Sequence, residues 1–210
     1  MENVVITIGR EYGSGGRYIG KEVAKRLNIN FYDKELLQKT YEKNQCNYTK
    51  LEQYDETKRN SILKAMDLLN SNNYEAAFED DRCQILISKT ILDLAQNESC
   101  VILGRNANNL LKDKKNVINI FIYSNDLDFK IKRKMETEKL SYQETFNKLK
   151  QVDKKRKKYY EYVNKNHIWG DKKDYDFCLD SSVLGIDGTI DLIVDIYKKK
   201  EGIKNGKQTI

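Results

Sequence analysis

The chain alternates between two patterns of hydrophobic positions. Short runs that are apolar throughout recur along it, which is typical of strands buried on both faces of a parallel sheet. Between these runs, apolar residues are spaced three and four apart, which predicts helices with one buried side. The runs expected to form strands are Val4–Ile8, Ile29–Tyr32, Cys100–Gly104, Val117–Tyr123 and Phe177–Leu179.

The helices expected between these strands have recognisable starts and faces. The segment Tyr18–Leu27 carries an apolar residue at every fourth position, which predicts one buried stripe. Ser141 and Glu144 have the spacing of a capping box, and the helix that they open is expected to run past Tyr160. Further helices are expected over Lys34–Glu42, Asp126–Glu138 and Thr189–Lys199, whereas the polar end, Glu201–Ile210, is expected to be frayed.

Strands that alternate with helices predict a doubly wound α/β fold, with a mainly parallel five-stranded sheet flanked by helices. At 210 residues, we expect one domain, 1–210. One segment interrupts the alternation. Residues 44–97 contain no convincing strand and carry two helical stripes, the second of which ends at Asn97. This segment is therefore expected to be a helical insertion that stands beside the core sheet.

A glycine-rich loop, Gly9–Arg17, joins the first expected strand to the first expected helix. Glycines let a backbone turn sharply and approach an anion closely. The N–H groups of such a turn form a concave set of donors, and the start of the following helix adds more. Arg17 adds a fixed positive charge at the mouth of that helix. This arrangement favours phosphate binding over a plain turn without a ligand.

The loop departs from the usual phosphate-binding pattern, G-x-x-x-x-G-K-[ST]. If Gly15 is the last loop glycine, the lysine position holds Gly16 and the hydroxyl position holds Arg17. If Gly16 is the last, Arg17 replaces the lysine and Tyr18 replaces the hydroxyl residue. In either register, the loop lacks the small hydroxyl side chain that would bind Mg²⁺.

Two further charged residues are expected near the loop. Asp33 follows the second strand, and Arg105 follows the third. Ligands of doubly wound sheets bind beyond the carboxyl ends of the strands, so all three features are expected at one edge. For Asp33, the plainer role of a helix cap is at least as well supported.

The net charge of +6 suits an anionic ligand. The densest basic run spans residues 148–158, although such a run is often a solvated helix face. Four scattered cysteines and a single histidine make a zinc site unexpected and indicate reduced thiols. No apolar run approaches the roughly 20 residues that span a bilayer, and no signal peptide is evident. We therefore expect a cytoplasmic protein without a membrane partner.

The order of these parts resembles the cytidylate kinases, and more closely the cytidylate kinase-like proteins of bacteria. The resemblance covers most of the chain and is carried by the loop Gly9–Arg17, by Gly104-Arg105-Asn106, by the basic Asp153–Arg156 and by Leu179–Ser182. It departs at Gly16 and Tyr18, where true cytidylate kinases have lysine and a hydroxyl residue, and after Asp33, where their Ser, Gly and Tyr are absent. The resemblance therefore implies a phosphate-handling kinase fold more firmly than it implies CMP as the substrate.

The resemblance implies an ATP-dependent kinase of a small phosphate acceptor, with a nucleoside monophosphate such as CMP as the first candidate. Mg²⁺ would be held mainly through phosphates and water, without protein ligands. Residues 44–97 would form the acceptor-binding insertion, and residues 141–172 a basic helical lid. ATP would be bound by Gly13, Ser14, Gly15, Gly16, Arg17 and Tyr18, and the acceptor by Asp33, Lys39, Arg105, Lys154 and Lys155. The catalytic residues would be Arg17, Arg105 and Arg156.

Two other classes of function remain open. The missing lysine is compatible with a nucleotide-binding regulator that has lost catalysis, which turnover of ATP would distinguish from a kinase. The basic charge is compatible with a nucleic-acid-binding protein, whose affinity would fall steeply with salt. Because no recognised nucleic-acid motif is present, nucleic acid is the least expected partner.

Overall fold

The computed structural model describes residues 3–33, 79–164 and 167–204. Within them lies a sheet of five strands, in the order β2-β3-β1-β4-β5, in which every neighbouring pair is parallel. This confirms the doubly wound α/β fold. The predicted helix 34–42, the acceptor ligand Lys39 and residues 44–78 lie outside the described residues. The strands are β1 (Val5–Arg10), β2 (Asn30–Tyr32), β3 (Cys100–Leu103), β4 (Val117–Tyr123) and β5 (Phe177–Asp180).

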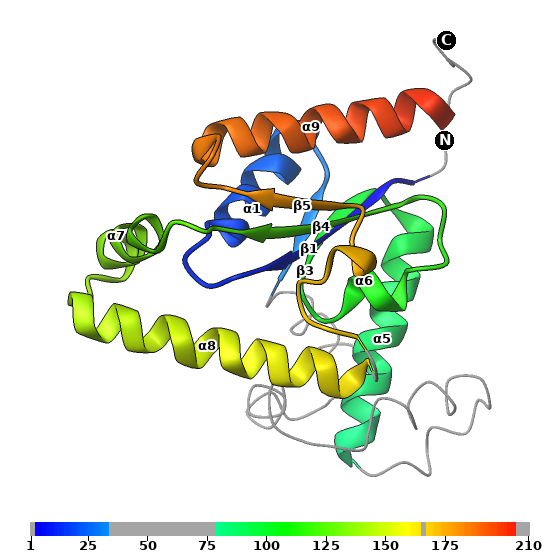
Figure 1. Cartoon of the computed structure of the whole chain (residues 1–210). Helices are drawn as coiled ribbons and strands as arrows, with labels where there is room; N and C mark the ends of the chain where they lie inside the picture. The colour runs from blue at the N-terminus through cyan, green and yellow to red at the C-terminus, as the bar shows by residue number, and fades with distance from the viewer. Residues whose placement is uncertain (1–2, 34–78, 165–166, 205–210) are drawn as a thin grey trace.

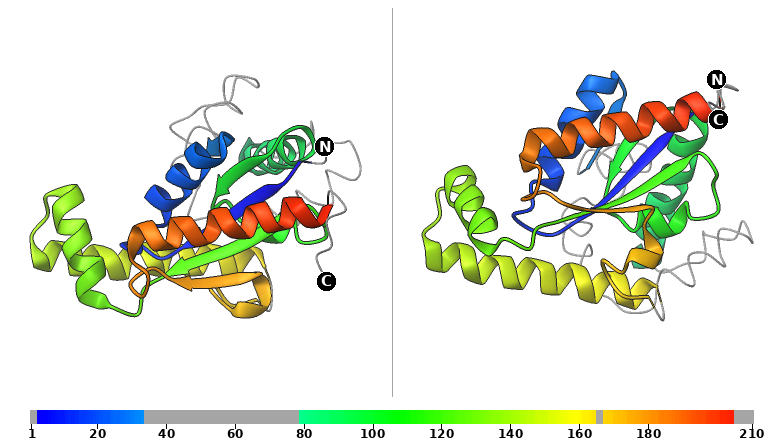
Figure 2. Two further views of the ribbon diagram at one scale, coloured as in Figure 1. Left: turned by 90° about the horizontal axis from the view of Figure 1, so that it is seen from above. Right: turned by 45° about the horizontal axis from the view of Figure 1, so that its top comes forward.

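Helices cover both faces of this sheet (Figure 1). On one side lie α1 (Gly16–Leu27) and α9 (Gly185–Lys204), which pack against each other as they cross the strands (Figure 2). On the other lie α5 (Glu79–Asn97), the short α6 (Ala107–Leu110) and the long α8 (Tyr142–Val163). The helix α7 (Leu127–Glu138) and a 3-10 turn (Lys172–Asp174) complete the described elements. Among the described residues, no helix has the length and apolar character that crossing a membrane requires.

Two hydrophobic cores, one on each face of the sheet, explain why the central strands are apolar on both faces. Ile6 and Ile8 of β1 and Ile120 of β4 face α1 and α9, and all three are fully buried. Val5 of β1 faces the opposite way, toward a core that Ile91 of α5 helps to fill. Alternate residues of one strand therefore enter different cores, as the period of two in a strand requires.

Several element boundaries differ from the expectation. The helix α1 begins at Gly16, two residues early, and α9 begins at Gly185 and continues to Lys204, so the first part of the expected frayed end is helical. The helix α5 ends at Asn97 as expected. It packs on the sheet, with Ile91 fully buried, so residues 79–97 belong to the core layers of the domain.

The strand order places β1 at the point where the chain changes direction across the sheet. From β1 the chain reaches β2 and β3 on one side and then crosses to β4 and β5 on the other. The loops leaving β1 and β3 therefore run apart and leave a crevice at the carboxyl ends of the strands. This crevice is where doubly wound sheets bind their ligands.

We expect Ile120→Ala to lower the free energy of unfolding by about 2–5 kcal/mol, because the removed atoms leave a cavity in a fully buried core. Chemical denaturation measures this change. Val183→Ala is the control, since Val183 is 75% exposed and its truncation should change stability by no more than about 0.5 kcal/mol. Equal losses in the two variants would contradict the assignment of the core.

Candidate active site

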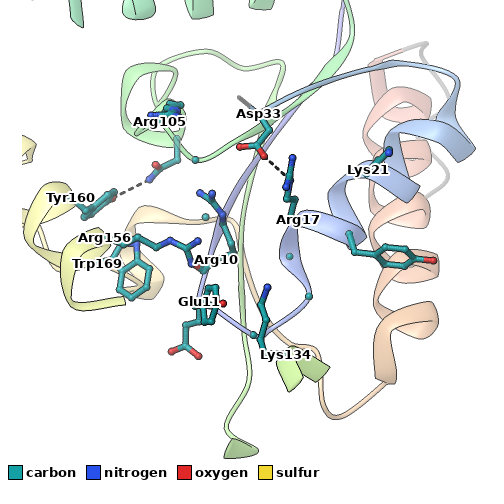
Figure 3. A pocket seen from close by; sticks show the side chains of 18 of the residues that line it. Arg10, Glu11, Arg17, Lys21, Asp33, Arg105, Lys134, Arg156, Tyr160 and Trp169 are labelled. Atoms are coloured by element: carbon teal, nitrogen blue, oxygen red, sulfur yellow. Dashed lines mark hydrogen bonds and ion pairs between the residues drawn. The ribbon is translucent and has the colours of Figure 1, made fainter. Parts of the chain in front are cut away.

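A cavity of about 720 Å³ opens at the carboxyl ends of β1, β2 and β3. Its volume lies in the range of small-molecule sites. The glycine loop forms one wall, Asp33 and the turn 104–106 form a second, and side chains of α7 and α8 form a third. The three features that the sequence placed at one edge of the sheet thus meet in one cavity (Figure 3).

The conformation of the glycine loop decides between the two possible registers. Gly15, at φ 84°, is the N-cap of α1, and the helix begins at Gly16. Gly15 is therefore the last loop glycine, and Gly16 occupies the lysine position of a phosphate-binding loop. The hydrogen bonds among the described residues leave the backbone N–H groups from Gly13 through Tyr18 without an acceptor. Such a set of free donors is suited to the oxygens of a phosphate group.

Buried hydroxyl groups fix the loop from behind. Ser14 is fully buried, and its Oγ donates to the carbonyl oxygens of Glu11 (2.9 Å) and Ile122 (3.1 Å). Ser181, which follows β5, donates from its Oγ to the carbonyl oxygen of Ser14 (2.7 Å). The Ser14 hydroxyl is thus used within the fold, and its backbone N–H remains the group that can bind a ligand.

The expected lid region is joined directly to the loop. The backbone N–H of Tyr12 donates to Oδ1 of Asp153 on α8 (2.8 Å), and Nη1 of Arg156 donates to the carbonyl oxygen of Arg10 (3.2 Å). The Tyr12 ring packs in a small core with Ile131 of α7 and Leu149 of α8. In this structure α7 and α8 therefore lie against the loop and close one side of the cavity.

Five arginines line the cavity: Arg133 of α7 and four that come from four other segments. Arg10 ends β1, Arg17 begins α1, Arg105 follows β3, and Arg156 lies on α8. The sequence analysis assigned roles to three of them and missed Arg10, whose side chain extends between Arg156 and Arg17 (Figure 3). Burial and the positive charges of these three arginines lower the pKa of Arg10 to about 9. A cavity with this charge distribution is suited to an anion with several negative oxygens.

An unusual turn presents Arg105. Gly104, Arg105 and Asn106 all have positive φ, at 73°, 58° and 56°. A non-glycine residue in this left-handed region is strained by about 1–3 kcal/mol, and such strain is concentrated at functional sites. The turn directs Arg105 into the cavity, close enough for its charge to act on Arg10 and on Tyr159.

Arg17 and Asp33 lie in contact with each other. Nε of Arg17 lies 2.7 Å from Oδ2 of Asp33, and the Arg17 side chain is 69% exposed. Asp33 is itself buried, at the end of β2. The guanidinium of Arg17 is thus held toward the end of β2.

The basic run on α8 divides between two faces of the helix. Arg156 lines the cavity together with Tyr159 and Tyr160, whereas Lys154 and Lys155 are exposed and do not line it. Tyr18, the last of the expected ATP ligands, is half exposed at the cavity, where the guanidinium of Arg133 lies over its ring. Trp169 completes the wall near Tyr160 and packs edge-on against Phe121.

The acidic residues that line the cavity are each paired with a cation. Within the described ranges, no three or more His, Cys, Asp or Glu side chains come together to hold a metal ion. Glu11 is paired with Lys130 (3.0 Å), Glu138 with Lys134 (2.7 Å), and Asp33 with Arg17. These residues fit a Mg²⁺ ion that is carried mainly by the phosphates of a nucleotide and by water.

Comparisons with known proteins agree with this architecture. A model of the "Cytidylate kinase-like family" matches residues 5–183. The crystal structure of an uncharacterized protein from Eubacterium ventriosum ATCC 27560 is 30% identical, with a TM-score of 0.69; the alignment covers 93% of this chain and 99% of that chain. No curated protein matches the chain.

Two shikimate kinases are more distant in structure. That from Bacteroides thetaiotaomicron is 14% identical, with a TM-score of 0.49, over 93% of this chain and 98% of its own. That from Aquifex aeolicus vf5 is 14% identical, with a TM-score of 0.43, over 95% of this chain and 99% of its own.

The contact between loop and lid is expected to depend on pH through Asp153. Burial raises the pKa of Asp153 to about 6, against the hydrogen bond from Tyr12 and the charge of Arg156, which lower it. The folded state therefore holds this proton more tightly than the unfolded chain. The proton bound to Asp153 therefore stabilises the folded state at low pH. This contribution is lost as the pH rises from about 4 to about 6.

Asp153→Asn should remove this dependence while keeping an oxygen that accepts from Tyr12. We expect the free energy of unfolding of the wild type to fall, relative to the variant, by up to about 3 kcal/mol between pH 4 and pH 6. Denaturant unfolding at several pH values measures the difference. Parallel pH profiles of the two proteins would contradict this account of the contact.

Proposed function

Because the chain belongs to the cytidylate kinase-like family, we propose that it transfers the γ-phosphoryl group of ATP to a small phosphate-bearing acceptor. A nucleoside monophosphate such as CMP is the first candidate. The observation that carries this proposal is the convergence of five arginines on a cavity whose glycine loop offers a row of unused backbone N–H groups. Two sets of donors suit two phosphate-bearing ligands.

The donor nucleotide is assigned to the loop. The N–H groups from Gly13 through Tyr18 would hold the β- and γ-phosphates, with the positive end of α1 behind them. Mg²⁺ bound to ATP would neutralise part of the phosphate charge. Its ligands would be phosphate oxygens and water, since the acids of the cavity are already paired.

The acceptor is assigned to the opposite side of the cavity. Arg105 and the Arg17–Asp33 pair lie there, at the ends of β3 and β2. An arginine fork binds a phosphate group through two parallel hydrogen bonds. The acceptor-binding role of residues 44–97, including the part outside the described residues, remains part of this proposal.

The reaction needs little covalent help from the protein. A phosphate oxygen of the acceptor attacks the γ-phosphorus, the bond from phosphorus to the bridging oxygen of ADP breaks, and the electron pair leaves with ADP. The attacking oxygen of a nucleoside monophosphate is already anionic, so no proton has to be removed first. What the site must supply is alignment and positive charge, and the arginines of the cavity have that character.

The lid helix is proposed to exclude water from this reaction. Arg156 reaches the cavity from α8, and its contact with the backbone of Arg10 joins the lid to the loop. Closure around both ligands would prevent transfer of the phosphoryl group to water. Lys154 and Lys155, which are exposed in this arrangement, would contribute only if α8 turned or moved toward an acceptor. We propose a cytoplasmic location for this reaction, where ATP is available.

The direct test is an assay of ADP formation with ATP and Mg²⁺ across a panel of acceptors. The panel should contain the common nucleoside monophosphates and a set of small hydroxyl and carboxylate compounds. Transfer to a nucleoside monophosphate, above the rate of ATP hydrolysis without an acceptor, supports the proposal. Binding of ATP with no transfer to any acceptor would overturn it and favour a regulator.

We expect Arg105→Ala to raise the KM for the acceptor by about 10- to 100-fold, because a charged hydrogen bond to the acceptor phosphate is lost. The KM for ATP should change by less than about threefold. Steady-state kinetics with each substrate varied in turn separates the two effects. Arg26→Ala is the matched control, because Arg26 pairs with Asp191 on the α9 side of α1. An equal rise in both KM values would refute the division of the cavity.

A further inference from the structure

The loop differs from an ordinary phosphate-binding loop by an exchange of two residues. With Gly15 as the last glycine, the pattern G-x-x-x-x-G-K places its first glycine at position 10 and its lysine at position 16. This chain has Arg10 and Gly16 at those positions. The cation is therefore present in the loop, but at the end of β1 instead of at the start of α1.

Long side chains at positions 10 and 16 would occupy the same space. A Cβ atom added to Gly16 would lie 2.6 Å from Cβ and 3.1 Å from Cγ of Arg10, and the shorter distance is far below any normal contact between carbon atoms. The stem of Arg10 thus occupies the place where a side chain at position 16 would begin. One of the two residues can carry a long side chain, and the other must then be glycine.

The Arg10 guanidinium lies across the cavity, over the turn after β3. A Cβ atom added to Gly104 would lie 2.2 Å from its Nη1. Among the described residues, this guanidinium makes no hydrogen bond and no ion pair, whereas that of Arg17 is paired with Asp33. A partly buried cation with unused donors, placed between the glycine loop and Arg105, is poised for a ligand.

We propose that Arg10 is the catalytic cation of the phosphoryl transfer, in the place of the lysine that the loop lacks. Its guanidinium would bind oxygens of the transferring phosphoryl group, between the donor on the loop and the acceptor beside Arg105. This inference rests on the proposed function. It assigns to Arg10 the role that the sequence alone gave to Arg17.

The chemistry of arginine suits this position better than that of lysine. A planar fork of donors can hold oxygens of two neighbouring phosphate groups at once, whereas an ammonium group is a point charge. The charge on the phosphoryl oxygens and on the leaving ADP oxygen is redistributed during transfer, while the fixed guanidinium needs no rearrangement to stabilise it. The exchange of residues would thus keep the function of the loop and extend its reach toward the acceptor.

The test changes the residues at positions 10 and 16 singly and together. Arg10→Ala should lower kcat by about 10²- to 10³-fold, and Arg10→Lys should lose less. Gly16→Lys alone should also be impaired, because the new stem would collide with that of Arg10. The double variant Arg10→Gly/Gly16→Lys restores the pattern G-x-x-x-x-G-K and should recover at least tenfold of the rate lost in Arg10→Gly. Arg26→Ala is the control for loss of an arginine outside the cavity.

Gly16→Lys is thus expected to lower the rate when Arg10 is present and to raise it when residue 10 is glycine. A merely structural arginine would not produce this reversal. A kcat of Arg10→Ala within threefold of the wild type would overturn the inference while leaving the proposed function intact. So would a folded double variant that is no more active than Arg10→Gly.

A second measurement is independent of turnover. Isothermal titration with inorganic tripolyphosphate should give at least tenfold weaker binding for Arg10→Ala than for the wild type and for Arg26→Ala. If the wild type transfers phosphate to no acceptor, the proposed function fails, and this titration still decides whether Arg10 binds the phosphate chain. Unchanged affinity would overturn the assignment of Arg10. Thermal unfolding of each variant identifies any that lose activity through loss of the fold.

Discussion

Repulsion between like charges is the constraint on which this site depends. Five guanidinium groups line one cavity, and the acids that share it are already paired with other cations or with Arg17. Burial and, after it, the charges of neighbouring arginines lower the pKa of Arg10, which expresses the cost of holding these charges together away from water. An arrangement of this kind is stabilised when an anion enters, because the ligand supplies the counter-charge that the protein lacks. The cavity therefore needs negative charge that a bound anion would supply.

The rest of the fold keeps this charge in place. The carboxyl ends of β1, β2 and β3 lie at one edge of the parallel sheet. Two buried serines fix the glycine loop through hydrogen bonds to its backbone. The strained turn at Arg105 and the contacts from α8 to Tyr12 and to the backbone of Arg10 fix the remaining walls. Positive charge that is held in advance does not have to be reorganised during a reaction, which is the property that phosphoryl transfer requires.

The sequence was sufficient to predict the sheet because its central strands β1, β3 and β4 are buried on both faces, which leaves continuous apolar runs with little ambiguity. It was not sufficient to choose the register of the loop, since Gly15 and Gly16 are adjacent and only the start of α1 distinguishes them. The run on α8 shows a second limit. Arg156 and Tyr160 face the cavity, but Lys154 and Lys155 do not, because neighbouring residues on a helix point in different directions. Arg10 was missed because its role depends on the lack of a side chain at Gly16, whose place the stem of Arg10 takes in the folded loop. The exchange of glycine and cation between positions 10 and 16 was the signal that could have revealed it.

The account is tested most directly by a crystal structure of the protein with a non-hydrolysable ATP analogue, Mg²⁺ and CMP. We expect the β- and γ-phosphates within about 2.7–3.2 Å of the backbone N–H groups from Gly13 through Tyr18. The guanidinium of Arg10 should contact the γ-phosphate, and that of Arg105 the acceptor phosphate. A triphosphate bound away from the loop, or one bound to the loop with Arg10 turned out of the cavity, would contradict the account.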